Sequence, residues 1–257
     1  MSGYPAVTAK RNHRKQDHIV QGPTEAQTMQ WDEEGYLVFT DAIENDELRR
    51  LQNAFDYWAN QCKPDWLERV ERGEQEATYF DIPNPIEKDE IFVDIVDHPS
   101  YYGCLRHFTD GEPMFLGEAV RVLPPWPLSY TGWHPDVPHT NPLHIKIQIY
   151  VNDVDPGCGE FAYVPASHKR GAGPYTRPLF QESMPGHRRF AAKAGAAVMF
   201  NAYGWHAAMD NHSLIPRKSI ILIYEKRSPG QVDAEPFTSI AHLCTSPERR
   251  RLFSLEE

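Results

Sequence analysis

The chain has 257 residues, 40% of them hydrophobic and 12% aromatic, and a net charge of −10 at neutral pH. This length and apolar content favour one folded domain and exclude a disordered chain, and the negative charge argues against general nucleic-acid binding. The 22 prolines exclude a coiled coil, and the scattered cysteines exclude a zinc ribbon or a disulfide framework: Cys62, Cys104, Cys158 and Cys244.

Residues 1–22 are polar and lack the apolar segment of a signal peptide. We expect them to form a mobile tail. Because no run of about 18 apolar residues occurs, we expect no membrane span. The cysteine pattern fits a reducing compartment, so we expect a cytoplasmic protein.

The first predicted elements are a strand at 35–43 and a helix at 44–62. The apolar residues of the helix segment are spaced three and four apart, which predicts one buried stripe formed by Leu48, Leu51, Phe55, Trp58 and Cys62. Two further short helices are expected within 64–74 and 98–108.

From Phe115 onward, short apolar runs are broken by Gly and Pro, a pattern typical of an antiparallel sandwich or barrel. The strand expected at 144–154 places alternate isoleucines on one face, and Lys146 and Gln148 on the other. In an exposed strand this polar face would be solvated, whereas in a closed jelly roll it would line a polar cavity. Further strands are expected at 160–168, 196–206 and 218–227.

The segment "WHPD" at 133–136 carries a metal-ligand pattern. His134 and Asp136 are two residues apart in a proline-rich, extended segment, so their side chains fall on the same side of the backbone. His206, at the end of the strand expected at 196–206, is the best candidate for a third ligand. Two imidazoles and one carboxylate on one face of a metal form the facial triad of non-haem Fe(II) oxygenases, which leaves positions open for a co-substrate and O₂.

Arg217 and Ser219 stand at the start of the strand expected at 218–227 and share one of its faces. A guanidinium binds a carboxylate through two hydrogen bonds, and a hydroxyl adds a third donor. A surface salt bridge is the ordinary role of a lone arginine at a strand start. The spacing from His206 favours a different role, namely binding the distal carboxylate of a dicarboxylic co-substrate such as 2-oxoglutarate.

Three segments together resemble the phytanoyl-CoA dioxygenase (PhyH) family of Fe(II)/2-oxoglutarate-dependent oxygenases. They are "WHPD", "YVNDVDPGCGEFAYVPASHKRG" at 150–171 and "GWHAAMDNHSLIPRKS" at 204–219. The resemblance runs from about residue 30 to 227 and departs from the family pattern at Ala166, where glycine is usual. It implies a mainly β protein with flanking helices, whose core is a double-stranded β-helix (a cupin-like jelly roll).

The resemblance also implies a ligand set. His134, Asp136 and His206 would bind Fe(II), with 2-oxoglutarate and O₂ as co-substrates. The implied reaction releases succinate and CO₂ and hydroxylates an unactivated carbon. Related halogenases lack the carboxylate ligand, so the presence of Asp136 predicts oxygenation rather than halogenation. The same ligands would also serve desaturation, ring closure or epimerisation.

In the same way, Arg217 would bind the C5 carboxylate of 2-oxoglutarate, assisted by Ser219. Gln148 is expected as a further co-substrate contact, with Lys146 as the alternative. His168 belongs to the Ser-His-Lys segment of the family and is expected to be structural.

The substrate is expected to be a small molecule, with no nucleic acid and no membrane as partner. Aromatic residues near the ligands would form either a pocket wall or core packing: Trp126, Tyr130, Trp133 and Trp205. Lys146 is a further candidate for the substrate pocket. The segment 168–193 is basic, with Lys169, Arg170, Arg177, Arg188, Arg189 and Lys193 against Glu182 alone. It is either a solvated loop face or a lid that attracts an anionic group of the substrate.

Two other classes of protein share parts of this pattern. A catalytically silent jelly-roll metal-binding or sensor protein would need the metal ligands but not Arg217 or Ser219. A co-chaperone with a His-Pro-Asp loop would need a basic helix before residue 134, and the three prolines of 121–133 exclude that helix. We therefore expect one jelly-roll oxygenase domain at 23–245 and a C-terminal tail at 246–257.

Overall fold

The computed structural model describes residues 21–127, 131–230 and 234–255. The tail expected at 1–22 therefore lies almost wholly outside the described residues, and so does Tyr130. Among the described residues, no helix is both long and apolar enough to cross a membrane.

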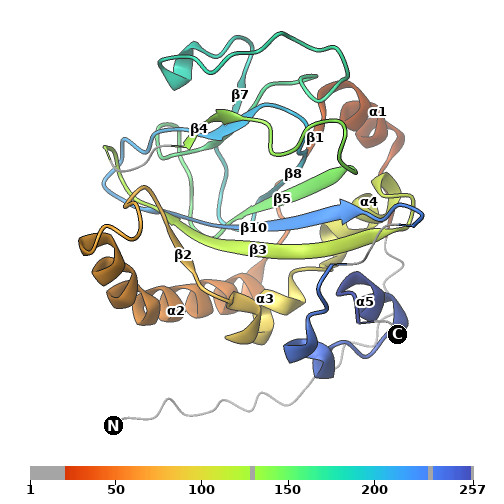
Figure 1. The fold of residues 1–257 in the computed structure, drawn as a ribbon, viewed down its shortest axis with the longest axis horizontal. Helices are drawn as coiled ribbons and strands as arrows, with labels where there is room; N and C mark the ends of the chain where they lie inside the picture. Colours follow the sequence, from red (N-terminus) through yellow and green to blue (C-terminus); the bar gives the residue numbers. More distant parts are fainter. Residues whose placement is uncertain (1–20, 128–130, 231–233, 256–257) are drawn as a thin grey trace.

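The strands form two antiparallel sheets that pack face to face (Figure 1). The major sheet has the order β1 (Tyr36–Phe39), β8 (Ala197–Asn201), β5 (His144–Tyr150), β10 (Arg217–Lys226), β3 (Pro113–Leu123) and β2 (Phe80–Ile82). The minor sheet has the order β4 (Thr131–His134), β9 (His206–Ala208), β6 (Phe161–Tyr163) and β7 (Arg188–Phe190). This arrangement is the jelly roll that the sequence predicts.

Helices cover the outer face of the major sheet, where alternate strand residues are apolar. Leu51 and Phe55 of α2 pack in one cluster with Ile147 of β5 and Leu222 of β10. The bounds of the helices are α1 (Glu25–Glu34), α2 (Asn45–Glu71), η1 (Pro85–Glu87), α3 (Glu90–Asp94), α4 (Pro99–Phe108), η2 (Gln181–Ser183), η3 (Thr238–Leu243) and α5 (Pro247–Leu252).

The two helices expected at 44–62 and 64–74 are one continuous helix, α2, with Pro64 in its interior. A proline there removes one backbone hydrogen bond. The apolar stripe nevertheless continues past it, because Trp66 packs against the core and its ring lies 5.5 Å from that of Phe80. Tertiary packing on both sides of Pro64 thus maintains the helix.

The strand expected at 196–206 is divided between the two sheets. Its first part is β8 in the major sheet, and His206 begins β9 in the minor sheet rather than ending the first strand. A turn containing Gly204 connects them, and a Cβ atom at that position would lie 1.9 Å from Tyr163 Oη. The chain can cross between the sheets here because glycine leaves room for the tyrosine.

Residues 246–255 fold onto the domain, although a tail was expected at 246–257. Ser246 caps α5 through its side chain, and Leu252 and Phe253 are buried in the main core cluster. Arg249 Nη2 donates to the Val93 carbonyl at 2.9 Å and attaches α5 to α3. The segment is polar and rich in arginine, so its few apolar residues did not indicate a packed helix.

One carboxyl group lies inside the apolar layer between the major sheet and the helices. The register places Glu118 of β3 beside Leu222 and Ile147, on the helix-covered face. Both carboxyl oxygens are buried without a hydrogen-bond partner among the described residues. Burial raises the pKa of Glu118 well above its usual value, because the charged form loses its hydration.

We predict that Glu118→Met raises the free energy of unfolding at pH 7 by about 1–3 kcal/mol, because it removes an unsatisfied buried carboxyl group. Because the pKa of Glu118 is higher in the folded than in the unfolded state, the wild type loses stability as the pH rises above the unfolded-state pKa, and it continues to do so up to the folded-state pKa. The advantage of the variant should therefore be smaller near pH 5 than at pH 7. Urea unfolding at both pH values measures this, and a variant less stable than wild type at pH 7 would contradict it.

Candidate metal centre

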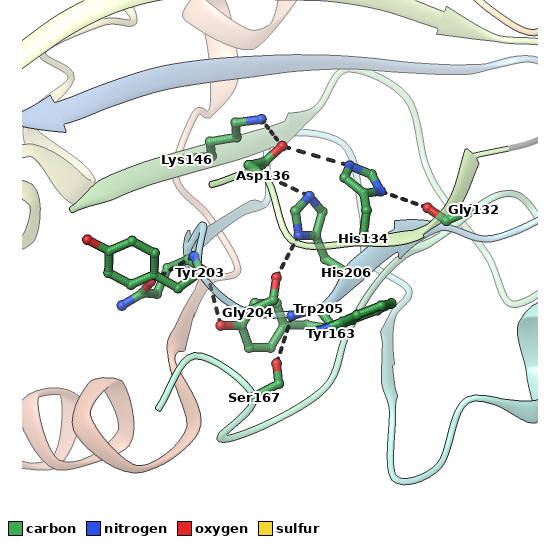
Figure 2. A network of polar contacts seen from close by, with 11 residues as sticks. Gly132, His134, Asp136, Lys146, Tyr163, Ser167, Tyr203, Gly204, Trp205 and His206 are labelled. Atoms are coloured by element: carbon green, nitrogen blue, oxygen red, sulfur yellow. Dashed lines mark hydrogen bonds and ion pairs between the residues drawn. The ribbon is translucent and has the colours of Figure 1, made fainter. Parts of the chain in front are cut away.

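The two sheets bring the three predicted metal ligands together (Figure 2). His134 ends β4, His206 begins β9, and the two residues are cross-strand partners. Asp136 follows β4, and its backbone N–H donates to the Ala202 carbonyl at 3.0 Å. One donor atom from each of the three side chains lies within 4.8 Å of the others.

Backbone carbonyls fix the tautomer of both histidines. Nδ1 of His134 lies 2.7 Å from the Gly132 carbonyl, and Nδ1 of His206 lies 3.0 Å from the Gly204 carbonyl. Because a carbonyl only accepts, each Nδ1 carries the hydrogen and each Nε2 presents a lone pair. Burial lowers the pKa of His206 to about 4, so its imidazole is neutral at pH 7, as a metal ligand must be.

Both Nε2 atoms face the carboxylate of Asp136. The distances are 3.8 Å from His134 Nε2 to Oδ1 and 3.3 Å from His206 Nε2 to Oδ2. Lys146 Nζ donates to Oδ1 at 2.6 Å, whereas Oδ2 is buried without a hydrogen-bond partner. Burial alone would raise the pKa of the Asp136 carboxyl group, but interactions with His206 and Lys146 lower it by more. The pKa of Asp136 therefore lies below its usual value, and the carboxyl group is ionised at pH 7.

The donor set therefore fits a divalent cation. Two neutral imidazole nitrogens and one ionised carboxylate oxygen converge, and the buried Oδ2 of Asp136 lacks any other partner. A buried anionic oxygen without a hydrogen bond is costly, and a metal ion would compensate it. Two nitrogens and one oxygen on one side are the ligand types of non-haem iron sites.

A cavity of about 150 Å³ lies beside the three ligands. Gln148 and Lys146 line it, so the polar face of the strand at 144–154 points into the molecule and not into solvent. Ser219 lies on the same face of the major sheet, because it pairs with Tyr150 and Arg121. The Oγ of Ser219 and the Nε2 of Gln148 are buried and without hydrogen-bond partners among the described residues.

Arg217 also lines the cavity and is only 2% exposed. Its Nη1 donates to the Gly159 carbonyl at 2.5 Å, while its Nε has no partner. Within the described part of the chain, no carboxylate lies within 4 Å of this guanidinium. Burial lowers its pKa to about 10, so it is a buried cation at pH 7 with donors available for an anion.

The aromatic residues expected as pocket walls lie elsewhere. Trp133 is 1% exposed and packs on the outer face of the minor sheet with Met184 and Met209. Alternation explains this, because its neighbour His134 points into the cavity and Trp133 must point away. Trp205 packs against the same outer cluster, and Trp126 is 60% exposed and not among the cavity residues.

The cavity also contains residues that we did not predict from the sequence. Phe161 and Phe200 form its apolar wall and lie against the His206 ring, with centroids 5.8 and 4.8 Å away. Arg121 lines it as well, paired with Asp81 through two hydrogen bonds of 2.7 Å. A charged residue within the apolar run 113–123 was the available signal for Arg121.

The basic segment 168–193 is partly neutralised. Three of its cations pair with acidic side chains: Arg188 with Glu34, Arg189 with Glu182, and Lys193 with Asp153. Arg170 and Arg177 instead donate to the backbone carbonyls of His139 and Trp133. The face therefore carries less free positive charge than the sequence indicates.

The other histidines of the described residues are not among those that line the cavity. His139 is close to Tyr203, with ring centroids 4.4 Å apart, and His144 Nε2 lies 3.1 Å from Glu225 Oε2. His168 lies near the turn after α1, where a Cβ atom on Gly35 would collide with its ring. This position agrees with the structural role that the sequence predicts for His168.

The fold and the site define a jelly-roll protein with a two-histidine, one-carboxylate cluster at the edge of a buried polar cavity. The profile of the phytanoyl-CoA dioxygenase (PhyH) family matches residues 31–219. The chain therefore belongs to this family of Fe(II)- and 2-oxoglutarate-dependent oxygenases. A comparison with curated protein sequences gives no significant match.

Solved structures with the same fold include several non-haem 2-oxoglutarate-dependent enzymes. The carbocyclase SnoK from nogalamycin biosynthesis superposes with a TM-score of 0.62 at 16% identity, covering 80% of this chain and 86% of SnoK. HygX from Streptomyces hygroscopicus, solved with nickel, 2-oxoglutarate and hygromycin B bound, gives 0.60 at 14% identity, covering 83% and 98%. The epimerase SnoN from nogalamycin biosynthesis gives 0.56 at 17% identity, covering 81% and 87%.

We predict that Gly204→Ala lowers stability by about 1–3 kcal/mol and weakens metal binding. The added Cβ would meet the Tyr163 ring and displace His206, which is two residues away. Gly22→Ala is the control, because nothing lies within 4 Å of a Cβ at that position. Thermal unfolding and Mn²⁺ titration measure both effects, and a variant equal to the control in both would contradict the prediction.

Proposed function

We propose that this protein is an Fe(II)- and 2-oxoglutarate-dependent dioxygenase that hydroxylates an unactivated carbon of a small-molecule metabolite. The observation that carries the proposal is the arrangement of one cavity. Its lining combines three converging side chains of metal-ligand type with the buried guanidinium of Arg217, which has no carboxylate within 4 Å among the described residues. Family membership supports the same chemistry.

His134, Asp136 and His206 would hold the iron. The histidines keep their protons on Nδ1, bound to backbone carbonyls, so their Nε2 atoms stay free to coordinate. Bound iron supplies the activation of O₂ that is coupled to oxidative decarboxylation of 2-oxoglutarate to succinate and CO₂. The presence of Asp136 supports oxygenation rather than halogenation, because the carboxylate ligand is retained.

Arg217, Ser219 and Gln148 would hold 2-oxoglutarate. Each has a buried donor without a hydrogen-bond partner among the described residues, namely Nε, Oγ and Nε2. A dicarboxylate in the cavity would accept from these groups and neutralise the guanidinium. The apolar rings of Phe161 and Phe200 exclude water around it.

The cavity is small for a metabolite in addition to the co-substrate, since pockets for drug-sized ligands measure about 300–1,000 Å³. We place the substrate outside it, at the side where the His134 side chain is 36% exposed. An anionic group on the substrate would be attracted by Arg170 and Arg177, which have no acidic partner within 4 Å in the described chain.

The alternative is a catalytically silent jelly-roll metal-binding or sensor protein. It would account for the metal ligands but not for the buried donor atoms without hydrogen-bond partners on Gln148, Arg217 and Ser219. Among 2-oxoglutarate-dependent enzymes of this fold, SnoK is a carbocyclase and SnoN is an epimerase. Product analysis after substrate screening separates hydroxylation from these outcomes.

The test of the metal site is an anaerobic titration with Fe(II) and 2-oxoglutarate. We expect the weak visible charge-transfer band of a 2-oxo acid chelated to Fe(II). His206→Ala and Asp136→Ala should abolish it, because each removes one of three protein ligands. Iron binding without a band in the wild type would favour the silent metal protein and contradict the proposal.

Arg217→Met should raise the dissociation constant for 2-oxoglutarate about 30-fold or more, while iron stays bound, because it removes a buried charge-assisted contact of about 2 kcal/mol or more. Arg188→Met is the matched control, since Arg188 is an exposed strand arginine paired with Glu34. Titrating the charge-transfer band gives both constants. Equal affinity in the two variants would refute the assignment of Arg217.

A further inference from the structure

Lys146 occupies an unusual position for a lysine. It lies in the middle of β5, between the paired residues Phe200 of β8 and Ile223 of β10. Strand alternation turns its side chain into the cavity, where it is only 16% exposed. Lysine is seldom buried without a compensating partner.

That partner is the carboxylate of Asp136. Nζ lies 2.6 Å from Oδ1, and within the described chain no other carboxylate lies within 4 Å of Nζ. The two oxygens of Asp136 therefore differ, because Oδ1 accepts from an ammonium group and Oδ2 has no hydrogen-bond partner. Oδ2 is also the oxygen nearest to His206 Nε2, at 3.3 Å.

This asymmetry determines how the carboxylate can serve as a ligand. An oxygen bound to an ammonium group at 2.6 Å has less electron density to offer to a metal than a free oxygen. Coordination through both oxygens would require the ion pair to break inside a cavity where Nζ has no second carboxylate. Only Oδ2 is available without that cost.

The number of donor atoms matters for the reaction. A six-coordinate metal held by three protein atoms has three positions left, which suffice for the two chelating atoms of 2-oxoglutarate and for O₂. A carboxylate bound through both oxygens would occupy one of these positions. A group that keeps Oδ1 away from the metal therefore preserves the position that O₂ needs.

We propose that Lys146 is a positioning residue that holds Asp136 as a one-oxygen metal ligand. The inference rests on the proposed function, because it requires a metal at His134, Asp136 and His206. It assigns Lys146 to the metal ligand and not to the co-substrate. Polar partners of a ligand commonly orient it in this way, and their loss alters the metal site.

The test counts the water molecules bound to Mn²⁺ in the intact protein. Mn²⁺ is paramagnetic and prefers six ligands, so water-proton relaxation reports its exchangeable inner-sphere waters. In Lys146→Met, Oδ1 is released and becomes a second donor atom. We expect this variant to bind Mn²⁺ with one inner-sphere water fewer than the wild type, both before and after 2-oxoglutarate is added.

Lys218→Met is the matched control. Lys218 lies on β10 of the same sheet and also forms a 2.6 Å ion pair, with Asp56, but it is not among the cavity residues. The control should retain the wild-type water count. Lys146→Arg keeps a cationic donor for Oδ1 and should also have the wild-type water count. If Lys146→Met does not fold, Lys146→Leu is a second variant without the charge.

The possible outcomes separate the two proposals. If the wild type binds no Mn²⁺, the proposed function fails, and the role of Lys146 falls with it. If the wild type binds Mn²⁺ and the folded Lys146→Met variant has the same water count, Lys146 does not position Asp136, while the proposed function stands. Loss of Mn²⁺ binding in the folded variant would equally overturn the inference, because it requires Asp136 to remain a ligand.

Discussion

The carboxylate of Asp136 places a negative charge between the two sheets, and much of the surrounding structure compensates it. A buried charge is tolerated only when partners replace its lost hydration. Here the cationic partner is Lys146 of β5, while His134 of β4 and His206 of β9 turn the lone pairs of their Nε2 atoms toward the carboxylate, an arrangement that a bound metal ion would complete. Because these strands belong to both sheets, the arrangement around Asp136 depends on the register of the strands. A shift of one residue in any of them would turn its side chain away from the carboxylate.

The jelly roll makes this site possible by separating two kinds of surface on the same strands. In β5, alternate isoleucines pack under the helices, while Lys146 and Gln148 face the cavity. The polar side carries donors without partners on Gln148, Arg217 and Ser219. Such groups lower the stability of the folded chain. An anionic ligand that accepts hydrogen bonds from these donors would remove this cost, which is consistent with a binding role.

The interior of the cavity and the segments outside it differ in structure. The proposed metal ligands and co-substrate donors lie between the two sheets, and all of them except Asp136 lie on paired strands. The segments 136–143 and 168–187 contain no strand, and Arg170 joins them to each other by donating to the His139 carbonyl. In the proposed reaction, these segments select the substrate, while the interior keeps its geometry.

The sequence pattern predicted an antiparallel sandwich or barrel, and the resemblance to the PhyH family implied the jelly roll. The period of two divided the residues of β5 between two faces, but it left open whether Lys146 and Gln148 meet solvent or a cavity. It also brought His134 and Asp136 to one side of an extended segment. Three features appear only in the folded structure. The segment 196–206 divides between the two sheets, Trp133 and Trp205 pack on the outer face of the minor sheet, and Leu252 and Phe253 join the main core. Lys146 and Asp136 show the reason most clearly. Ten residues separate them, and their contact depends on how β5 and the segment after β4 face each other, which no local pattern specifies.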